Sequence, residues 1–232
     1  MKRLLKILSL MLLVFIISGA TTKTAALLDE VVVEEERTVT LYSLDGREEV
    51  VKESDVEAQL TVGWYLEPVT VLYSKDGRAE VTPVSKVEEQ KTVGWYEQPI
   101  NINYSAFEKT NIPAYCLDKM LAGSPLQGCG IYFYNMEQTY GVNSVFAIAV
   151  TEVESSIGRH NANTNNFWGR KSTNGGWMRW DSKEESIMDF GRYMNRVYPG
   201  RSIEQIGPKY CPSPAGWAGK VKTCMTRRYN MF

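Results

Sequence analysis

The chain has 232 residues, a formal net charge of −1 and a hydrophobic fraction of 44%. This length fits one medium-sized domain and one small region. A single histidine and four cysteines without close doublets exclude a typical zinc site and give no support to Ser-His or Cys-His catalysis. We expect no metal, no cofactor and no nucleic acid partner.

The near-zero net charge conceals two regions of opposite sign. Residues 28–99 contain 17 acidic and 7 basic residues, a net charge of −10, whereas residues 100–232 contain 10 acidic and 15 basic residues, a net charge of +5. Such a shift in composition indicates two regions with different partners. The basic region would suit an anionic polymer.

Residues 1–26 have the pattern of a secretory signal. Three basic residues, Lys2, Arg3 and Lys6, precede the apolar run ILSLMLLVFIISGA, and small residues such as Ala25 and Ala26 follow it. The run is shorter than the roughly 20 residues that span a bilayer. The chain is therefore expected to be secreted, or held at the cell wall or membrane outside the cytoplasm, with this segment either cleaved or kept as an anchor.

Residues 38–99 contain two copies of one sequence pattern. The matched groups, 31 positions apart, are Tyr42 and Tyr73, Asp-Gly-Arg at 45–47 and 76–78, and Gly-Trp-Tyr at 63–65 and 94–96. Asp-Gly between β-prone runs predicts a hairpin, and a serine at the start of the next segment predicts a short helix that ends at glycine. We expect a ββα unit in each copy, with Trp64 and Trp95 either in a small core or available to a wall or protein ligand.

The four cysteines form two pairs of equal spacing, because 13 positions separate Cys116 from Cys129 and Cys211 from Cys224. An even number of cysteines in an exported chain favours disulfides. The simplest pairing joins Cys116 to Cys129 and Cys211 to Cys224, and the other two connectivities stay open.

The segment from Asn143 to Gly158 predicts a helix with Asn143 or Ser144 as its cap. At about 100° per residue, Glu152 and Glu154 point about 160° apart and cannot face one cleft. Glu154 lies in the last turn, where half-burial at the edge of a cleft raises the pKa of a carboxyl group and lets it act as an acid. Glu152 is expected to be solvated or ion-paired at the surface.

Two sets of side chains follow Glu154: the asparagines Asn161, Asn163, Asn165 and Asn166, and the tryptophans Trp168, Trp177 and Trp180. The asparagines are either ordinary loop formers or polar groups that recognise amide groups of a ligand. The tryptophans are either core residues or surfaces on which the apolar faces of sugars stack.

Two further helices are expected after this loop. The first begins at Ser182, which forms a capping-box pattern with Glu185. The second lies within SPAGWAGKVKTCM, with Ser213 as its cap and Pro214 at its first helical position.

The motif VESSIG and the downstream motif NNFWGRK resemble the paired motifs of glycoside hydrolase family 73, bacterial endo-β-N-acetylglucosaminidases of the lysozyme superfamily. Later segments keep the family's order. WDSKEESIMDFGRYM resembles the helix that follows its β-lobe, and YCPSPAGWAGKV resembles its tyrosine-containing segment. The resemblance runs from about Gly130 to Met225.

This resemblance implies a set of site residues. It places the general acid at Glu154 and the family's active-site tyrosine at Tyr210. The substrate-binding positions are Asn165, Asn166, Phe167 and Gly169, to which Trp168 and Trp177 are added as rings for sugar stacking.

Two departures from the family pattern affect the mechanism. The interval RKSTNGGWMRWDS lacks the second acid that many members carry, and Ser213 stands near the position of the family's aspartate. We therefore expect catalysis with one carboxylic acid, in which either the substrate's N-acetyl group or a water held by Tyr210 and the asparagines attacks the sugar.

The sequence predicts an α+β, mainly α-helical protein, with a signal or anchor at 1–26, ββα repeats at 38–99 and a lysozyme-like glucosaminidase domain at 100–232. The resemblance implies an exported, monomeric peptidoglycan hydrolase that cleaves β-1,4 glycosidic bonds after N-acetylglucosamine. The alternatives are a lytic transglycosylase or other muramidase-type cleavage, and a non-catalytic glycan-binding or scaffold protein.

Overall fold

The computed structural model describes residues 36–211, 213 and 215–232. The expected signal segment, residues 1–26, lies outside the described residues. Within the described part of the chain, no helix is long and apolar enough to cross a membrane.

The first repeat forms a three-stranded antiparallel sheet and one short helix. Strands β1 (Thr38–Ser43) and β2 (Glu48–Lys52) form the hairpin, and β3 (Trp64–Tyr65) pairs with the other edge of β1. The 3-10 turn η1 (Glu53–Asp55) and the helix α2 (Val56–Thr61) connect β2 to β3.

The second repeat has the same order of elements. They are β4 (Val69–Ser74), β5 (Ala79–Pro83), η2 (Val84–Lys86), α3 (Val87–Thr92) and β6 (Trp95–Tyr96). The register of the hairpin is also the same, since Thr40 lies opposite Val50 in the first copy and Val71 lies opposite Val81 in the second. Both copies are therefore hairpin-plus-helix units, as predicted, with a short third strand added to each.

The tryptophans of the repeats lie nearer the surface than the centre of each unit. In the first copy Leu41 is fully buried, whereas Trp64 is half-buried beneath the guanidinium of Arg47, 5.6 Å from its ring centroid. The second copy repeats this arrangement with Leu72, Trp95 and Arg78. The leucines are thus buried at the centres of the two units, and the Arg-Trp pairs lie nearer the surface.

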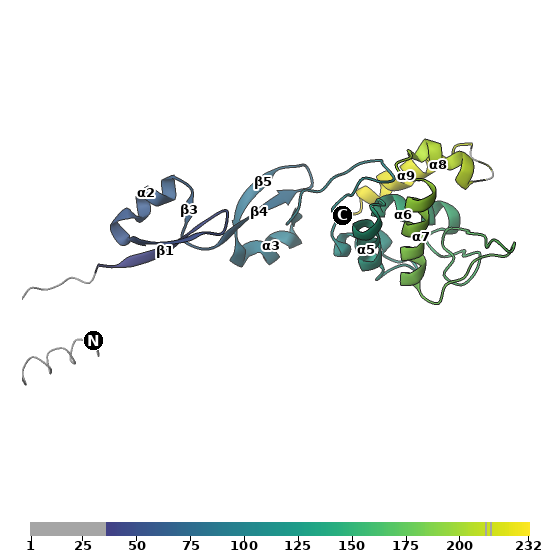
Figure 1. Cartoon of the computed structure of the whole chain (residues 1–232). Coiled ribbons are helices and arrows are strands. Elements are labelled where there is room, and N and C mark those ends of the chain that lie inside the picture. Colours follow the sequence, from purple (N-terminus) through teal and green to yellow (C-terminus); the bar gives the residue numbers. More distant parts are fainter. Residues whose placement is uncertain (1–35, 212, 214) are drawn as a thin grey trace, which may run out of the picture. The chain divides into compact units, whose positions relative to one another are not determined.

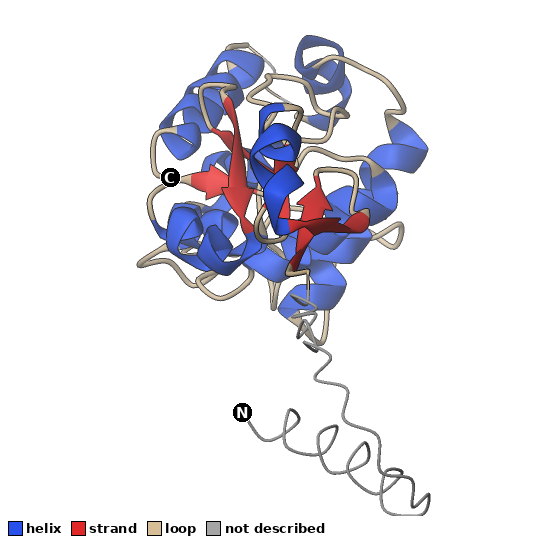
Figure 2. Ribbon diagram, turned by 90° about the vertical axis from the view of Figure 1, so that its left-hand side faces the viewer, coloured by secondary structure: helices blue, strands red, loops and turns tan. Residues whose placement is uncertain are grey.

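The rest of the described chain is mainly helical (Figures 1 and 2). Its helices are α4 (Ala114–Leu121), α5 (Gly130–Tyr140), α6 (Ser144–Ser155), α7 (Lys183–Val197), α8 (Ile203–Tyr210) and α9 (Trp217–Tyr229).

Helix α6 is the central element of this helical part. Every residue from Ser144 to Thr151 is buried, because α6 packs along α9 and against α5 (Figure 1). Its cap is Asn143, one of the two predicted candidates, whose side chain accepts a hydrogen bond of 2.9 Å from the backbone N–H of Phe146. Packing of the buried part of α6 therefore fixes the position of its C-terminal turn, in which residues 152–154 are only partly buried.

A buried carboxylate ties the start of α6 to its surroundings. Glu137 of α5 is fully buried and accepts hydrogen bonds from three backbone N–H groups, those of Thr110 (3.0 Å), Asn111 (3.1 Å) and Ser144 (2.8 Å). The hydroxyls of Thr110 and Ser144 donate to it as well. The carboxylate thus joins α5, the segment before α4 and the first turn of α6.

Aromatic side chains fill the core beside α6. The ring of Trp168 stacks on that of Phe190 with a centroid separation of 4.4 Å, and Phe167 meets Trp168 edge-on. Tyr96 of the second repeat belongs to the same hydrophobic cluster. The fold class is α+β and mainly α, as predicted.

The structure does not contain the expected disulfides, since all four cysteines are free thiols. Cys116 lies among Tyr96 and Tyr115, whereas Cys129 lies at the N-cap of α5, near Asp118. Equal sequence spacing gives no information on side-chain direction, and this structure does not show the predicted pairing.

The four thiols should differ sharply in reactivity. Cys211 is half-exposed, whereas burial raises the pKa of Cys116, Cys129 and Cys224 above the usual range for thiols and so lowers their thiolate fraction. Alkylation of the native protein at pH 8, followed by mass mapping, should modify Cys211 first. Labelling of Cys116 at the rate of Cys211, or recovery of disulfide-linked peptides, would contradict this expectation.

Candidate active site

Glu154 lies in the last turn of α6, at a pocket of about 550 Å³. The pocket is lined by side chains of the loop after α6, of α7 and of α8: His160, Ala162, Trp168, Gly169, Arg170, Lys171, Trp177, Tyr193, Tyr210 and Cys211. Glu154 is the one carboxylate in this lining among the described residues. Four of the other lining side chains are aromatic, which suits the apolar faces of a sugar ring.

The carboxyl group of Glu154 is held by one hydrogen bond. The indole Nε1 of Trp217, at the start of α9, donates to Oε1 at 2.9 Å. A Cβ placed on Gly169 would lie 3.9 Å from Oε2, so the second oxygen lies beside the glycine that lines the pocket. Trp217 therefore fixes Oε1, and Oε2 is left to face the pocket.

Burial raises the pKa of Glu154 above its ordinary value, and the Trp217 hydrogen bond opposes that rise by favouring the ionised form. Burial is the larger effect. The protonated carboxyl is therefore populated at a higher pH than in a solvated glutamate, as a general acid requires.

Tyr210, the last residue of α8, lies beside Trp217 with a centroid separation of 5.3 Å. Its hydroxyl donates to the backbone carbonyl of Trp168 at 3.1 Å. Burial, and to a lesser degree the charge of Glu154, raises the pKa of Tyr210 well above its usual range. The phenol therefore stays protonated, and its oxygen remains free to accept a hydrogen bond from a ligand or water.

The other predicted site residues divide into two groups. Trp168, Gly169 and Trp177 line the pocket, and Trp177 is 47% exposed. Asn165 donates through Nδ2 to the carbonyl of Trp180 at 2.9 Å, and Phe167 is buried. The structure thus brings Trp168, Gly169, Trp177 and Tyr210 around Glu154 and places Asn165 and Phe167 behind the pocket wall.

Asn166 is fully buried, and its amide holds the pocket loop together. Nδ2 donates to the carbonyls of Arg170 and Met178, both at 2.9 Å, and Oδ1 accepts from the N–H of Arg170 at 2.9 Å. This side chain shapes the loop that carries Trp168 and Gly169, and because it is fully buried it does not reach a bound sugar.

The chain leaves α6 through an unusual backbone. Ser156, Ile157 and Gly158 follow one another in the left-handed region, with φ of 52°, 57° and 79°. The hydroxyl of Ser155 donates to the carbonyl of Phe167 at 2.8 Å and accepts from the N–H of Gly158 at 3.0 Å. This tight reversal leads the chain into the loop that lines the pocket at Glu154.

Sequence reasoning missed Trp217, Tyr193 and Arg170. Tyr193 lies on α7 and stacks under the guanidinium of Arg170, 4.1 Å from its centroid. Arg170 is also ion-paired with Asp189. Burial would raise the pKa of Asp189, but the guanidinium groups of Arg192 and Arg170 outweigh burial and hold that pKa below its usual range. Trp217 and Tyr193 lie on helices far from the pocket loop in sequence, so no local pattern marks them. Arg170 belongs to the motif NNFWGRK, which could have pointed to it.

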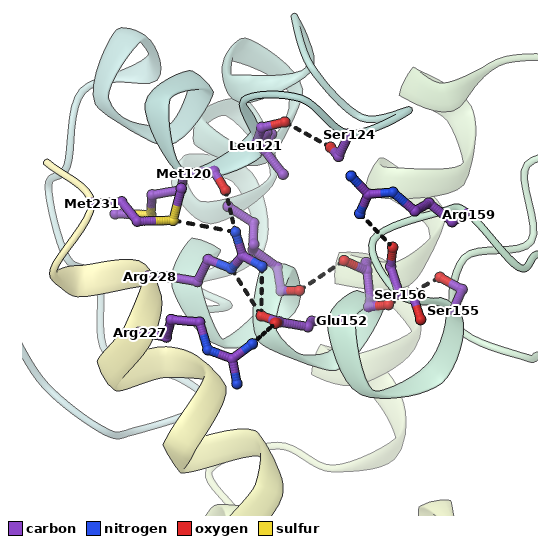
Figure 3. A network of polar contacts seen from close by, with 12 residues as sticks. Met120, Leu121, Ser124, Glu152, Ser155, Ser156, Arg159, Arg227, Arg228 and Met231 are labelled. Atoms are coloured by element: carbon purple, nitrogen blue, oxygen red, sulfur yellow. Dashed lines mark hydrogen bonds and ion pairs between the residues drawn. The ribbon is translucent and has the colours of Figure 1, made fainter.

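Glu152 points away from this pocket, as its position two residues before Glu154 predicts. Its carboxylate is ion-paired with Arg227 and Arg228 of α9 (Figure 3). Of the two expectations for Glu152, solvated or ion-paired, the structure shows the ion pair.

Replacing Trp217 by phenylalanine tests its hold on Glu154. Without the indole N–H the ionised carboxylate loses a donor, so the pKa of Glu154 should rise and the alkaline limb of the activity profile should move to higher pH. The turnover number should fall on the order of tenfold, because the carboxyl is less well fixed. Initial rates of the reaction proposed below for Glu154, followed across pH, measure both effects.

The matched control is Trp180→Phe, the same change at another buried tryptophan that does not bond Glu154. It should leave the alkaline limb where it is. An unshifted profile in Trp217→Phe would show that the hydrogen bond does not act on the carboxyl during cleavage.

Comparison with known proteins gives distant similarities. The sequence matches no family model and none of the curated proteins. S. aureus Autolysin E in complex with the muropeptide NAM-L-ALA-D-iGLU aligns with a TM-score of 0.46 at 15% identity, covering 68% of this chain and 83% of that one. The same protein without that ligand gives 0.45 at 16% identity over the same shares.

A catalytic mutant of S. aureus Autolysin E in complex with the disaccharide NAG-NAM gives a TM-score of 0.45 at 16% identity, covering 82% of this chain and 91% of that one. Similarities at such identities and TM-scores are distant and do not assign an activity to this chain.

Proposed function

We propose that this chain is a peptidoglycan hydrolase whose general acid is Glu154. The observation that carries the proposal is a single carboxyl of raised pKa at an aromatic-lined pocket. Protonation of the glycosidic oxygen by such a carboxyl starts the departure of the leaving group as an oxocarbenium-like state develops.

The second catalytic group is proposed not to be a carboxylate of this pocket. Because Tyr210 stays protonated and already donates to Trp168, its oxygen can hold a water or the N–H of an N-acetyl group but cannot remove a proton from water. We favour attack by the substrate's own N-acetyl oxygen, which needs no second acid and is an established alternative to paired carboxylates.

The bond cleaved is proposed to be the β-1,4 linkage after N-acetylglucosamine. The exposed ring of Trp177, with Lys171 5.4 Å from its centroid, offers a stacking surface beside a positive charge, which suits a glycan that also carries carboxylates. Action outside the cytoplasm, a monomeric state and the domain boundary near Ile100 remain proposals from the sequence.

A lytic transglycosylase is the second candidate, and the same single carboxyl favours it. In that reaction a hydroxyl of the substrate replaces water, so the enzyme again needs one acid. The two activities differ in their products and not in the residues that the pocket presents.

Mass spectrometry of purified sacculi digested by the full chain tests the proposal. Soluble fragments with reducing N-acetylglucosamine ends are expected. An anhydro ring at the new end would assign the transglycosylase, and binding without any soluble fragment would assign a non-catalytic glycan-binding role.

A further inference from the structure

A second pocket, of about 650 Å³, lies on the Glu152 side of α6. Its walls are the C-terminal end of α6, the turn after it and one face of α9 from Gly219 to Arg228. It shares no lining residue with the pocket at Glu154. The two pockets are separate sites on opposite faces of one helix.

The charge of this second pocket is strongly positive. Its charged lining consists of Arg159, Lys220, Arg227 and Arg228 against the single carboxylate of Glu152. Four cations and one anion leave an excess of three positive charges. An uncompensated excess of this kind attracts a multiply charged anion more strongly than it attracts one carboxylate.

Two of the four cations are held by backbone carbonyl groups. The Arg228 side chain is 8% exposed, donates to Glu152 at 2.7 and 2.9 Å, and donates to the carbonyl of Met120 at 2.6 Å (Figure 3). Arg159 donates to the carbonyl of Gly123 at 2.6 Å. These two guanidinium groups are fixed in place, so they define the shape of the pocket and contribute positive charge to it.

The other two cations are open to a ligand. Arg227 is 57% exposed and meets Glu152 through one nitrogen, Nη1, so more than half of its side chain remains accessible to a ligand. Lys220 is exposed, and within the described part of the chain it forms no ion pair. They lie seven residues apart on α9, which is about two helical turns, so both project from the same face.

We propose that this pocket binds a ligand that carries phosphate groups, with Lys220 and Arg227 as its direct contacts and Arg228 and Arg159 as the fixed frame. Phosphate oxygens accept the several N–H donors of a guanidinium and the point charge of an ammonium. Binding at this site would hold the protein on a phosphate-bearing polymer, and Glu154 would remain free to act on the other face of α6. It does not depend on the reaction proposed for Glu154.

Titration calorimetry of the full chain with inorganic tripolyphosphate, at fixed ionic strength, tests the site. One ligand per chain is expected. The double variant Lys220→Gln/Arg227→Gln should weaken binding by about tenfold, the loss of two exposed charge contacts. Citrate, a tricarboxylate, should bind more weakly than tripolyphosphate.

The matched control is Lys222→Gln, which removes a charge from the same helix outside the pocket, where Lys222 pairs with Glu204. It should change tripolyphosphate binding less than twofold, and neither variant should alter cleavage of phosphate-free glycan. An equal loss in Lys222→Gln, equal binding of citrate, or no binding by the wild-type chain would overturn the proposal.

Discussion

Glu154→Gln is expected to leave the fold intact and to reduce glycan cleavage by at least about a hundredfold, the lower range for loss of a general acid. Glutamine keeps the shape of the side chain and can still accept the Trp217 hydrogen bond, but it has no proton to give to the glycosidic oxygen. Release of soluble fragments from purified sacculi measures the loss, and the thermal melting of the variant checks the fold.

The pH profile of wild-type activity should reflect the titration of Glu154. Because burial raises the pKa of Glu154, activity should be retained above the ordinary glutamate pKa and then fall as the pH rises through the raised value, where the acid loses its proton.

Glu152→Gln is the matched control for Glu154→Gln, since it makes the same change two residues earlier on the other face of α6. It should cleave glycan within about twofold of wild type, as expected for a group outside the reacting site. Full activity in Glu154→Gln combined with loss in Glu152→Gln would move the acid to the other face.

Glu137→Leu should lower the free energy of unfolding by about 3–5 kcal/mol, the usual cost of removing one partner from a buried charged network. The substitution leaves the N–H groups of Thr110, Asn111 and Ser144 without their acceptor in the interior. Denaturant unfolding followed by circular dichroism measures the change.

Glu108→Leu provides the comparison, because Glu108 is exposed and lies in the segment that Glu137 ties down. It should shift the unfolding free energy by no more than about 0.5 kcal/mol. A Glu137→Leu variant within about 1 kcal/mol of wild type would mean that water satisfies the three N–H groups as well as the carboxylate does.

Local chemistry in the sequence predicts much of α6 and of the pocket. The Asn143 cap, the opposite directions of Glu152 and Glu154, and the Ser182 cap of α7, which accepts from the N–H of Glu185 at 3.0 Å, all depend on residues within a few positions of each other. Helical periodicity and capping are short-range effects, so one sequence suffices to find them.

Long-range contacts are what the sequence could not supply. Trp217 reaches Glu154 across 63 positions, and no spacing rule connects a helix start to a distant carboxyl. The predicted start of α9 was also too early, since the helix begins at Trp217 after Gly216 with φ of 75°. The free thiols were missed for the same reason, because side-chain direction depends on packing.

The left-handed run at the end of α6 limits which sequences this segment can accept. For residues with a Cβ such a backbone costs about 1–2 kcal/mol each, and burial of the Ile157 side chain offsets a comparable amount. Proline, whose φ is fixed near −65°, is excluded from positions 156 and 157, whereas glycine would fit Ser156 without loss of a buried group. In a library that varies this segment, we therefore expect variants to be lost first because they do not fit the backbone conformation, and only then because of an effect on catalysis.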